Sequence, residues 1–167
     1  SRGVNGILAV GEVMRPIYET QTDRNNEQRV ARQLSALWDR SIVKLKMACV
    51  IDFAILRDGK MVGVMEVKCR NYSSEAMDNM GGVMLSAHKA QAGMTWAMMH
   101  NIAFAFAVEL TDGIFVLFLT EHDDLSEFNL EIMGRKDRGD AQDMEPCIVI
   151  PMKRFKKYAE AVSTGSA

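Results

Sequence analysis

The sequence predicts a mixed α/β (α+β) fold in which a central mixed β-sheet is flanked by helices. Two strand hairpins, each with an Asp-Gly turn, alternate along the chain with two segments whose apolar residues recur at helical spacing. The 167 residues are 48% hydrophobic and 25% charged, which is typical of a globular chain with one sizeable core. Without an internal repeat or a long linker, we expect one domain over residues 1–167.

A first helix is predicted from Asp23 onward, with Asp23 or Asn25 as its N-cap. Val30 and Leu34 belong to a set of apolar residues that recur on one helix face. At about 100° per residue, Glu27 lies on that same face. A carboxylate is therefore expected to point toward the core.

Residues 47–57 and 61–68 are rich in Val, Ile and Met and are predicted to form an antiparallel hairpin around Asp58-Gly59. The register decides which side chains share a face of the sheet. A three-residue loop over 57–59 pairs residues whose numbers have an even sum, whereas a two-residue turn gives an odd sum. We predict the three-residue loop.

Three charged residues, Asp52, Glu66 and Lys68, interrupt these apolar strands. An even sum places all three on one face, and an odd sum moves Asp52 to the other face. Two carboxylates on adjacent strands, about 4.8 Å apart, repel each other unless a cation lies between them. Mg²⁺ suits such oxygen ligands and keeps waters and phosphate oxygens in its shell, with Mn²⁺ as a substitute. We predict a Mg²⁺ site here, with Lys68 orienting water or stabilising charge on a phosphate and Glu27 as a third carboxylate or second-metal ligand.

The next segments continue the same alternation. Residues 69–82 are polar and end in two glycines, so a loop is predicted, and residues 83–100 return to helical spacing. The apolar stretches "NIAFAFAVEL" and "IFVLFLT" are predicted to form a second hairpin around Asp112-Gly113. Their continuous hydrophobicity indicates strands that are covered on both faces.

The C-terminal third is less regular. Residues 121–145 are polar and carry no clear pattern. The stretch "EPCIVIPM" is predicted to add an edge strand, and "KRFKKYAEAV" a short basic helix.

The segment up to residue 120 resembles the PD-(D/E)XK, or restriction-endonuclease-like, nucleases. The resemblance is carried by "ID" at 51–52, "EVK" at 66–68, the hairpin between them, and the helices before and after, and it covers roughly residues 24–120. It implies an αβββαβ core in which Asp52, Glu66 and the backbone carbonyl of Val67 bind the metal and Lys68 is the catalytic lysine. Ile51 stands where the motif has proline, a replacement that many members share.

Two further positions follow from the resemblance. Glu27 matches the carboxylate that many members carry on the first helix, and Glu19 is the alternative for that role. Several branches also place a polar residue on the helix after the "ExK" strand. Gln91 is the expected residue there, with Lys89 behind it.

The function implied by the resemblance is Mg²⁺-dependent hydrolysis of phosphodiester bonds in DNA, in a phage, mobile-element or repair context. A homodimer is expected, because cutting two strands requires two symmetry-related sites. One alternative is a protein that keeps the nuclease fold without catalysis, as a DNA-binding subunit or an inhibitor of a defence system. Another is a structural protein in which Glu66 and Lys68 are merely solvated.

The net charge does not indicate DNA binding by an overall basic surface, since the formal charge is -2 and the pI is about 5.9. Contacts with DNA are therefore expected from local basic clusters. The candidates are Arg135, Lys136 and Arg138, and then Lys153, Arg154, Lys156 and Lys157.

Cysteine usage and hydropathy set the expected compartment. The three cysteines have no CxxC spacing, which argues against a disulfide framework or a structural zinc site and favours a reducing cytoplasm. The longest apolar runs are far shorter than the roughly 20 residues that span a bilayer, so no membrane association is expected.

Overall fold

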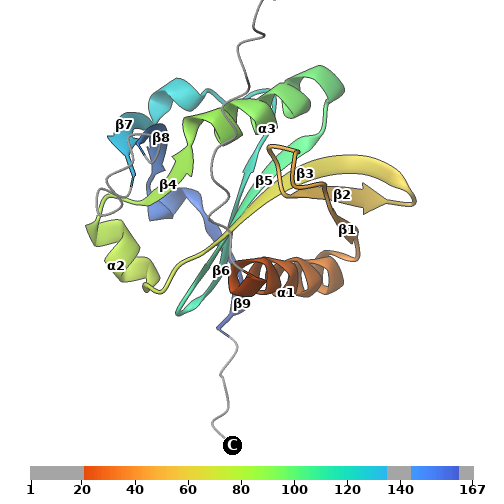
Figure 1. The fold of residues 1–167 in the computed structure, drawn as a ribbon, viewed down its shortest axis with the longest axis horizontal. Coiled ribbons are helices and arrows are strands. Elements are labelled where there is room, and N and C mark those ends of the chain that lie inside the picture. Colours follow the sequence, from red (N-terminus) through yellow and green to blue (C-terminus); the bar gives the residue numbers. More distant parts are fainter. Residues whose placement is uncertain (1–20, 135–143, 162–167) are drawn as a thin grey trace, which may run out of the picture.

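The computed structural model describes residues 21–134 and 144–161 (Figure 1). Within them, a six-stranded sheet has the order β1-β2-β3-β5-β6-β9, and a three-stranded sheet has the order β4-β8-β7. The larger sheet is formed by β1 (Ser41–Lys44), β2 (Phe53–Arg57), β3 (Lys60–Cys69), β5 (Ala103–Leu110), β6 (Gly113–Leu119) and β9 (Lys156–Glu160). The smaller is formed by β4 (Val83–Ser86), β7 (Asn129–Met133) and β8 (Glu145–Ile150). The helices are α1 (Gln21–Trp38), α2 (Ser74–Asn79) and α3 (Ala87–His100), with short 3-10 helices η1 (Leu125–Glu127) and η3 (Met152–Arg154).

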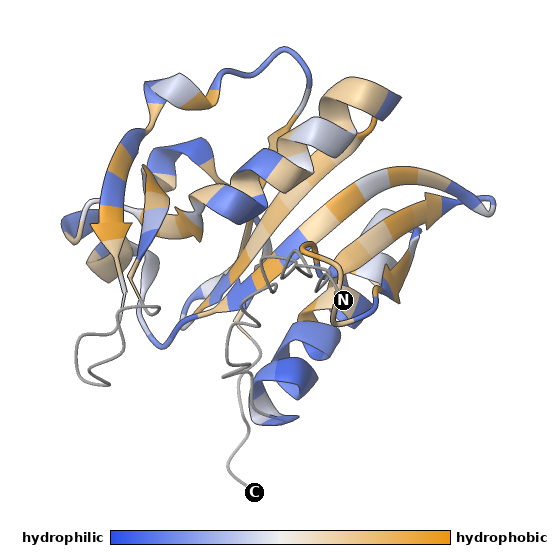
Figure 2. Cartoon of the chain, turned by 45° about the horizontal axis from the view of Figure 1, so that its top comes forward, coloured by the Kyte–Doolittle hydropathy of each residue, from blue (hydrophilic) through white to orange (hydrophobic). Residues whose placement is uncertain are grey.

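Strand β3 lies inside the larger sheet, antiparallel to β2 and parallel to β5, so the predicted mixed sheet is confirmed. Helices α1 and α3 lie on opposite sides of this sheet (Figure 1). Side chains of β3 therefore alternate between two cores: Met65 and Val67 pack with α1, and Val64 packs with α3. Figure 2 shows the hydrophobic central strands against the largely hydrophilic surface of α1.

The second hairpin has the predicted form. β5 and β6 pair antiparallel from Phe104–Leu119 down to Leu110–Gly113. Phe104 and Phe106 face the α3 side, and Ala105 faces the α1 side, and all three are fully buried. Burial on both faces explains why this stretch is apolar without alternation.

The first hairpin corrects the predicted loop but keeps its register. Arg57 pairs with Lys60 across a two-residue turn, with positive φ at Asp58 (51°) and Gly59 (74°), so the predicted three-residue loop is wrong. A register shift follows between Ile55 and Leu56. The extra residue of this bulge on β3 restores the even sum beyond it, as in the pair Phe53–Met65.

Several predicted element boundaries are also wrong. Residues 47–52 lie outside β2, residues 74–79 of the predicted loop form α2, and residues 83–86 of the predicted helix form β4. Asp23 and Asn25 lie inside α1 rather than at its N-cap.

The C-terminal elements differ as well. β8 is the middle strand of the smaller sheet rather than an edge strand, and the predicted basic helix is replaced by η3 and β9. β9 pairs with β6, and β8 pairs with both β4 and β7. These strands are stabilised by partners far away in the sequence, which local periodicity does not register.

In the described part of the chain, no helix combines the length and the hydropathy that crossing a membrane requires.

Close packing of α3 on the sheet gives a stability prediction. A Cβ added to Gly93 would lie 2.6 Å from three ring atoms of the fully buried Phe104. Gly93→Ala should lower the free energy of unfolding by about 1–3 kcal/mol, because overpacking outweighs the gain of about 0.5–1 kcal/mol in helix propensity. Urea unfolding would measure it, with Gln91→Ala on the exposed side of the same helix as the control. A Gly93→Ala protein as stable as the parent would contradict this packing.

Candidate functional site

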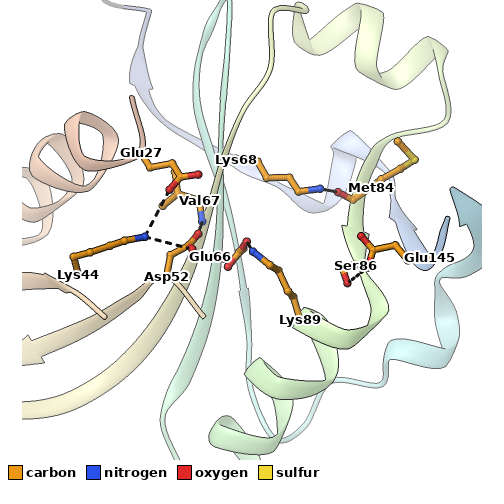
Figure 3. Close-up of polar contacts among 10 residues, drawn as sticks. All are labelled: Glu27, Lys44, Asp52, Glu66, Val67, Lys68, Met84, Ser86, Lys89 and Glu145. Atoms are coloured by element: carbon orange, nitrogen blue, oxygen red, sulfur yellow. Dashed lines mark hydrogen bonds and ion pairs between the residues drawn. The ribbon is translucent and has the colours of Figure 1, made fainter. Parts of the chain in front are cut away.

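The site begins where β2 and β3 separate. Their ladder ends at the pair Phe53–Met65, and Asp52 lies just before β2. The backbone N–H of Val67 donates a hydrogen bond of 3.2 Å to Oδ2 of Asp52 (Figure 3). The backbone carbonyl of Asp52 in turn accepts a hydrogen bond of 2.8 Å from Leu45. The Asp52 side chain thus takes the place of a strand partner for Val67 and is held beside β3.

Glu66 lies in the middle of β3 and is only 2% exposed. Its Oε1 accepts a charged hydrogen bond from Lys89, on the first turn of α3 (Figure 3). Its Oε2 is buried and has no hydrogen-bond partner among the described residues. Burial raises the pKa of Glu66 to about 8, with the nearby charge of Asp52 acting in the same direction and Lys89 opposing it. A further positive charge beside this carboxyl group would favour its ionised form.

Lys44 joins two carboxylates on the other side of the site. Its Nζ lies 3.6 Å from Oδ1 of Asp52 and 3.8 Å from Oε2 of Glu27 (Figure 3). Glu27 reaches this position from α1, on the same face as Val30 and Leu34, which are fully buried. The ammonium group of Lys44 thus bridges Glu27 and Asp52.

Lys68 follows Glu66 by two residues on β3 and extends toward the smaller sheet (Figure 3). Its Nζ donates a hydrogen bond of 2.6 Å to the backbone carbonyl of Met84 on β4. Burial lowers the pKa of Lys68 to about 8, and the positive charge of Arg70 acts in the same direction. Lys68 can therefore exchange a proton close to neutral pH.

Gln91 is not brought to the site, which corrects the residue expected on α3. Two residues on an α-helix differ by about 200° in direction, so Lys89 faces Glu66 while Gln91 faces away. Gln91 is exposed and lies in a shallow pocket with Leu125 and Ile148. Lys89 is the residue of α3 that reaches the buried carboxylate.

The other expected positions lie elsewhere. Glu19 and the cluster Arg135, Lys136 and Arg138 fall outside the described residues. The second basic cluster lies on η3 and β9, and β9 is three strands, or about 14 Å, across the sheet from β3. Two of its members are in ion pairs, Arg154 with Glu127 and Lys157 with Glu160.

Sequence reasoning missed Lys44 altogether and gave Lys89 a minor place. Lys44 ends β1, a four-residue strand that was not predicted. Two partly buried carboxylates suggest that a basic residue lies nearby, but they do not indicate which of the 20 lysines and arginines it is. Among residues 21–134 and 144–161, no three His, Cys, Asp or Glu side chains are grouped as a metal site; the carboxylates contact lysines instead.

Comparison with known proteins places this chain in a family. Residues 13–158 match the model of the family described as "Phage putative PDDEXK endonuclease". A comparison with curated proteins gave no match. Among solved structures, the chain is similar to Hjc, a Holliday junction resolvase from the archaeal hyperthermophile Archaeoglobus fulgidus, with a TM-score of 0.40 and 15% identity over 71% of this chain and 85% of that one. Because the family model spans most of its length, the chain belongs to the phage PDDEXK endonuclease family.

Proposed function

We propose that the protein is a Mg²⁺-dependent nuclease that hydrolyses phosphodiester bonds in DNA. The observation that carries the proposal is Glu66, a buried carboxylate with an oxygen that lacks a hydrogen-bond partner among the described residues. Such a group costs stability in a core and is retained where its chemistry is needed. Membership of an endonuclease family supports the same conclusion.

The residues present fit a divalent metal ion. Asp52, Glu66 and the backbone carbonyl of Val67 would hold it, since all three offer the hard oxygen donors that Mg²⁺ and Mn²⁺ prefer. Burial raises the pKa of Glu66, and its Oε2 is buried, so a bound cation would stabilise the ionised form. When bound, the ion would polarise the scissile phosphate and lower the pKa of a coordinated water.

The lysines would act on the substrate and on the carboxylates. Lys68 would orient the attacking water or stabilise the charge that develops on the phosphate, and its bond to Met84 limits its movement. Its pKa near 8 allows it to hold or release a proton at the working pH. Lys89 would compensate Glu66 before substrate binds, and Glu27 would position Asp52 through Lys44.

Cutting both strands of a duplex or a branched DNA requires two active sites. One site cuts one strand, so we propose that two copies act as a homodimer related by a two-fold axis. Light scattering in the presence and absence of duplex DNA would measure the mass of the assembly.

Cleavage of labelled substrates tests the activity. With Mg²⁺ or Mn²⁺ and a panel of linear duplex, single strand, four-way junction and RNA, we expect the parent protein to cut DNA and to be inactive in EDTA. Asp52→Ala and Lys68→Ala should each lower the rate by about 10²–10³-fold, because each removes a charge that acts on the reacting phosphate.

Lys60→Ala is the matched control, since Lys60 is an exposed lysine at the other end of the same strand. Cleavage that survives EDTA, or that is equal in Asp52→Ala and the parent, would refute the proposed site. Binding of DNA without any cleavage would favour a non-catalytic role.

Metal binding has its own readout in thermal unfolding. Mg²⁺ or Mn²⁺ at 100 times its Kd should stabilise the native state by about 2.7 kcal/mol. For a chain of this size that corresponds to a rise in Tm of about 5–10 °C. Asp52→Asn should abolish the rise, whereas Glu131→Gln, an exposed carboxylate on β7, should keep it. An equal rise in both variants would place the metal elsewhere.

The buried carboxylate also predicts how stability depends on pH without metal. The pKa of Glu66 rises from 4.5 to about 8 on folding, so the native state binds more protons than the unfolded state between these values. Its contribution is therefore complete below about pH 4.5 and is lost as the pH rises toward 8. In EDTA, the free energy of unfolding should fall less steeply from about pH 5 to about pH 8 in Glu66→Gln than in the parent.

Urea unfolding across that window would measure the slope, with Glu131→Gln as the exposed control. The window stops at pH 8 because the lowered pKa of Lys68 makes stability rise again above it. Equal slopes in Glu66→Gln and the parent would contradict the burial of an ionisable carboxylate at this position.

A further inference from the structure

The proposed hydrolysis does not by itself explain why residue 44 is a lysine. It pairs with Phe53 at the end of β1, and therefore lies on the face of the sheet that α1 covers. Its ammonium group lies between carboxylates from two other elements, 3.6 Å from Asp52 and 3.8 Å from Glu27 (Figure 3). The three side chains are only 15–27% exposed, so their charges are weakly screened.

A cation between two such carboxylates has a counterpart in metal-dependent hydrolysis. Enzymes that use two metal ions place them about 3.5–4 Å apart, and carboxylates hold the second ion beside the first. Here Asp52 is a proposed ligand of the first ion, and Glu27 is the neighbouring carboxylate. The positive charge that stands between the two is an amino group of the chain itself.

Resting on the proposed function of the Asp52–Glu66 pair, we infer that the Lys44 ammonium takes the place of a second metal ion and that the protein binds one divalent ion per site. Lys44 joins Asp52 and Glu27 through its ammonium group. A second ion would have to displace that charge and is therefore excluded at working metal concentrations.

The surroundings of Lys44 fix its side chain in this place. Its Nζ lies 4.9 Å from the centre of the Phe53 ring, within range of a cation–π interaction. The N–H of Leu45, the next residue, donates to the carbonyl of Asp52 and extends the pairing of β1 with β2. The ring thus contacts the ammonium group directly, and the hydrogen bond of Leu45 holds the backbone next to Lys44 in place.

The other lysine that contacts a proposed ligand differs in its placement. Lys89 lies on the opposite face of the sheet and pairs with Glu66, whose second oxygen is the buried one without a hydrogen-bond partner in the described part of the chain. Its side chain is 35% exposed and can turn toward solvent. Lys89 can therefore move away from Glu66 when a metal ion binds, whereas Lys44 remains between Asp52 and Glu27.

Counting bound Mn²⁺ tests the inference without measuring catalysis. Titration calorimetry and the electron paramagnetic resonance of free Mn²⁺ should give one ion per chain for the parent and two for Lys44→Ala. Lys44→Arg keeps the charge and should bind one. Adding Glu27→Gln to Lys44→Ala removes a ligand of the second ion and should restore one.

Two further variants guard against loss of structure. Lys44→Met retains the apolar stem against Phe53 and should also bind two ions, even if Lys44→Ala unfolds. Lys46→Ala changes an exposed lysine two residues away and should bind one ion, as the parent does.

The outcomes separate this inference from the proposed function. One ion in the parent and two in Lys44→Met support the inference. One ion in both proteins, or two in the parent, overturns it and leaves the proposed metal site at Asp52 and Glu66 intact. No Mn²⁺ bound by the parent overturns the metal-dependent function itself, and this inference with it.

Discussion

The buried carboxylate of Glu66 is the constraint on which the arrangement of this protein depends. It lies in the middle of β3, with both faces of the sheet covered and an oxygen that has no hydrogen-bond partner among the described residues. Burial raises its pKa to about 8, in spite of the opposing charge of Lys89. A core built for stability alone would place an apolar residue here. The fold therefore keeps a buried carboxyl group where the proposed function needs it.

The pairing of the strands around β3 brings Asp52 beside Glu66. β3 pairs with β5 from Gly63 to its end at Cys69, whereas its pairing with β2 stops at Met65. Beyond that point the N–H of Val67 turns to the side chain of Asp52 instead of a strand. Two carboxylates thus come together where two strands separate.

Three lysines from three different strands and helices surround the carboxylates, and each has a separate role in our proposal. Lys89 compensates Glu66 from α3, Lys44 bridges Asp52 and Glu27 from β1, and Lys68 extends from β3 to the smaller sheet. The smaller sheet is therefore part of the site, because its strand β4 supplies the carbonyl that holds Lys68. Together these charges describe a site that is electrostatically prepared for an anionic substrate.

The sequence by itself determined the mixed fold and both hairpins, because turn residues and strand alternation are local properties. It also singled out Asp52, Glu66, Val67 and Lys68, whose role in a site stays a prediction. It did not determine β1, β4 or β9, whose stability comes from strand partners far along the chain. For the same reason it did not identify Lys44, and it favoured Gln91 over Lys89. Only the tertiary structure decides which cation faces a buried carboxylate, since that depends on how separate elements pack and not on the spacing of residues along one of them.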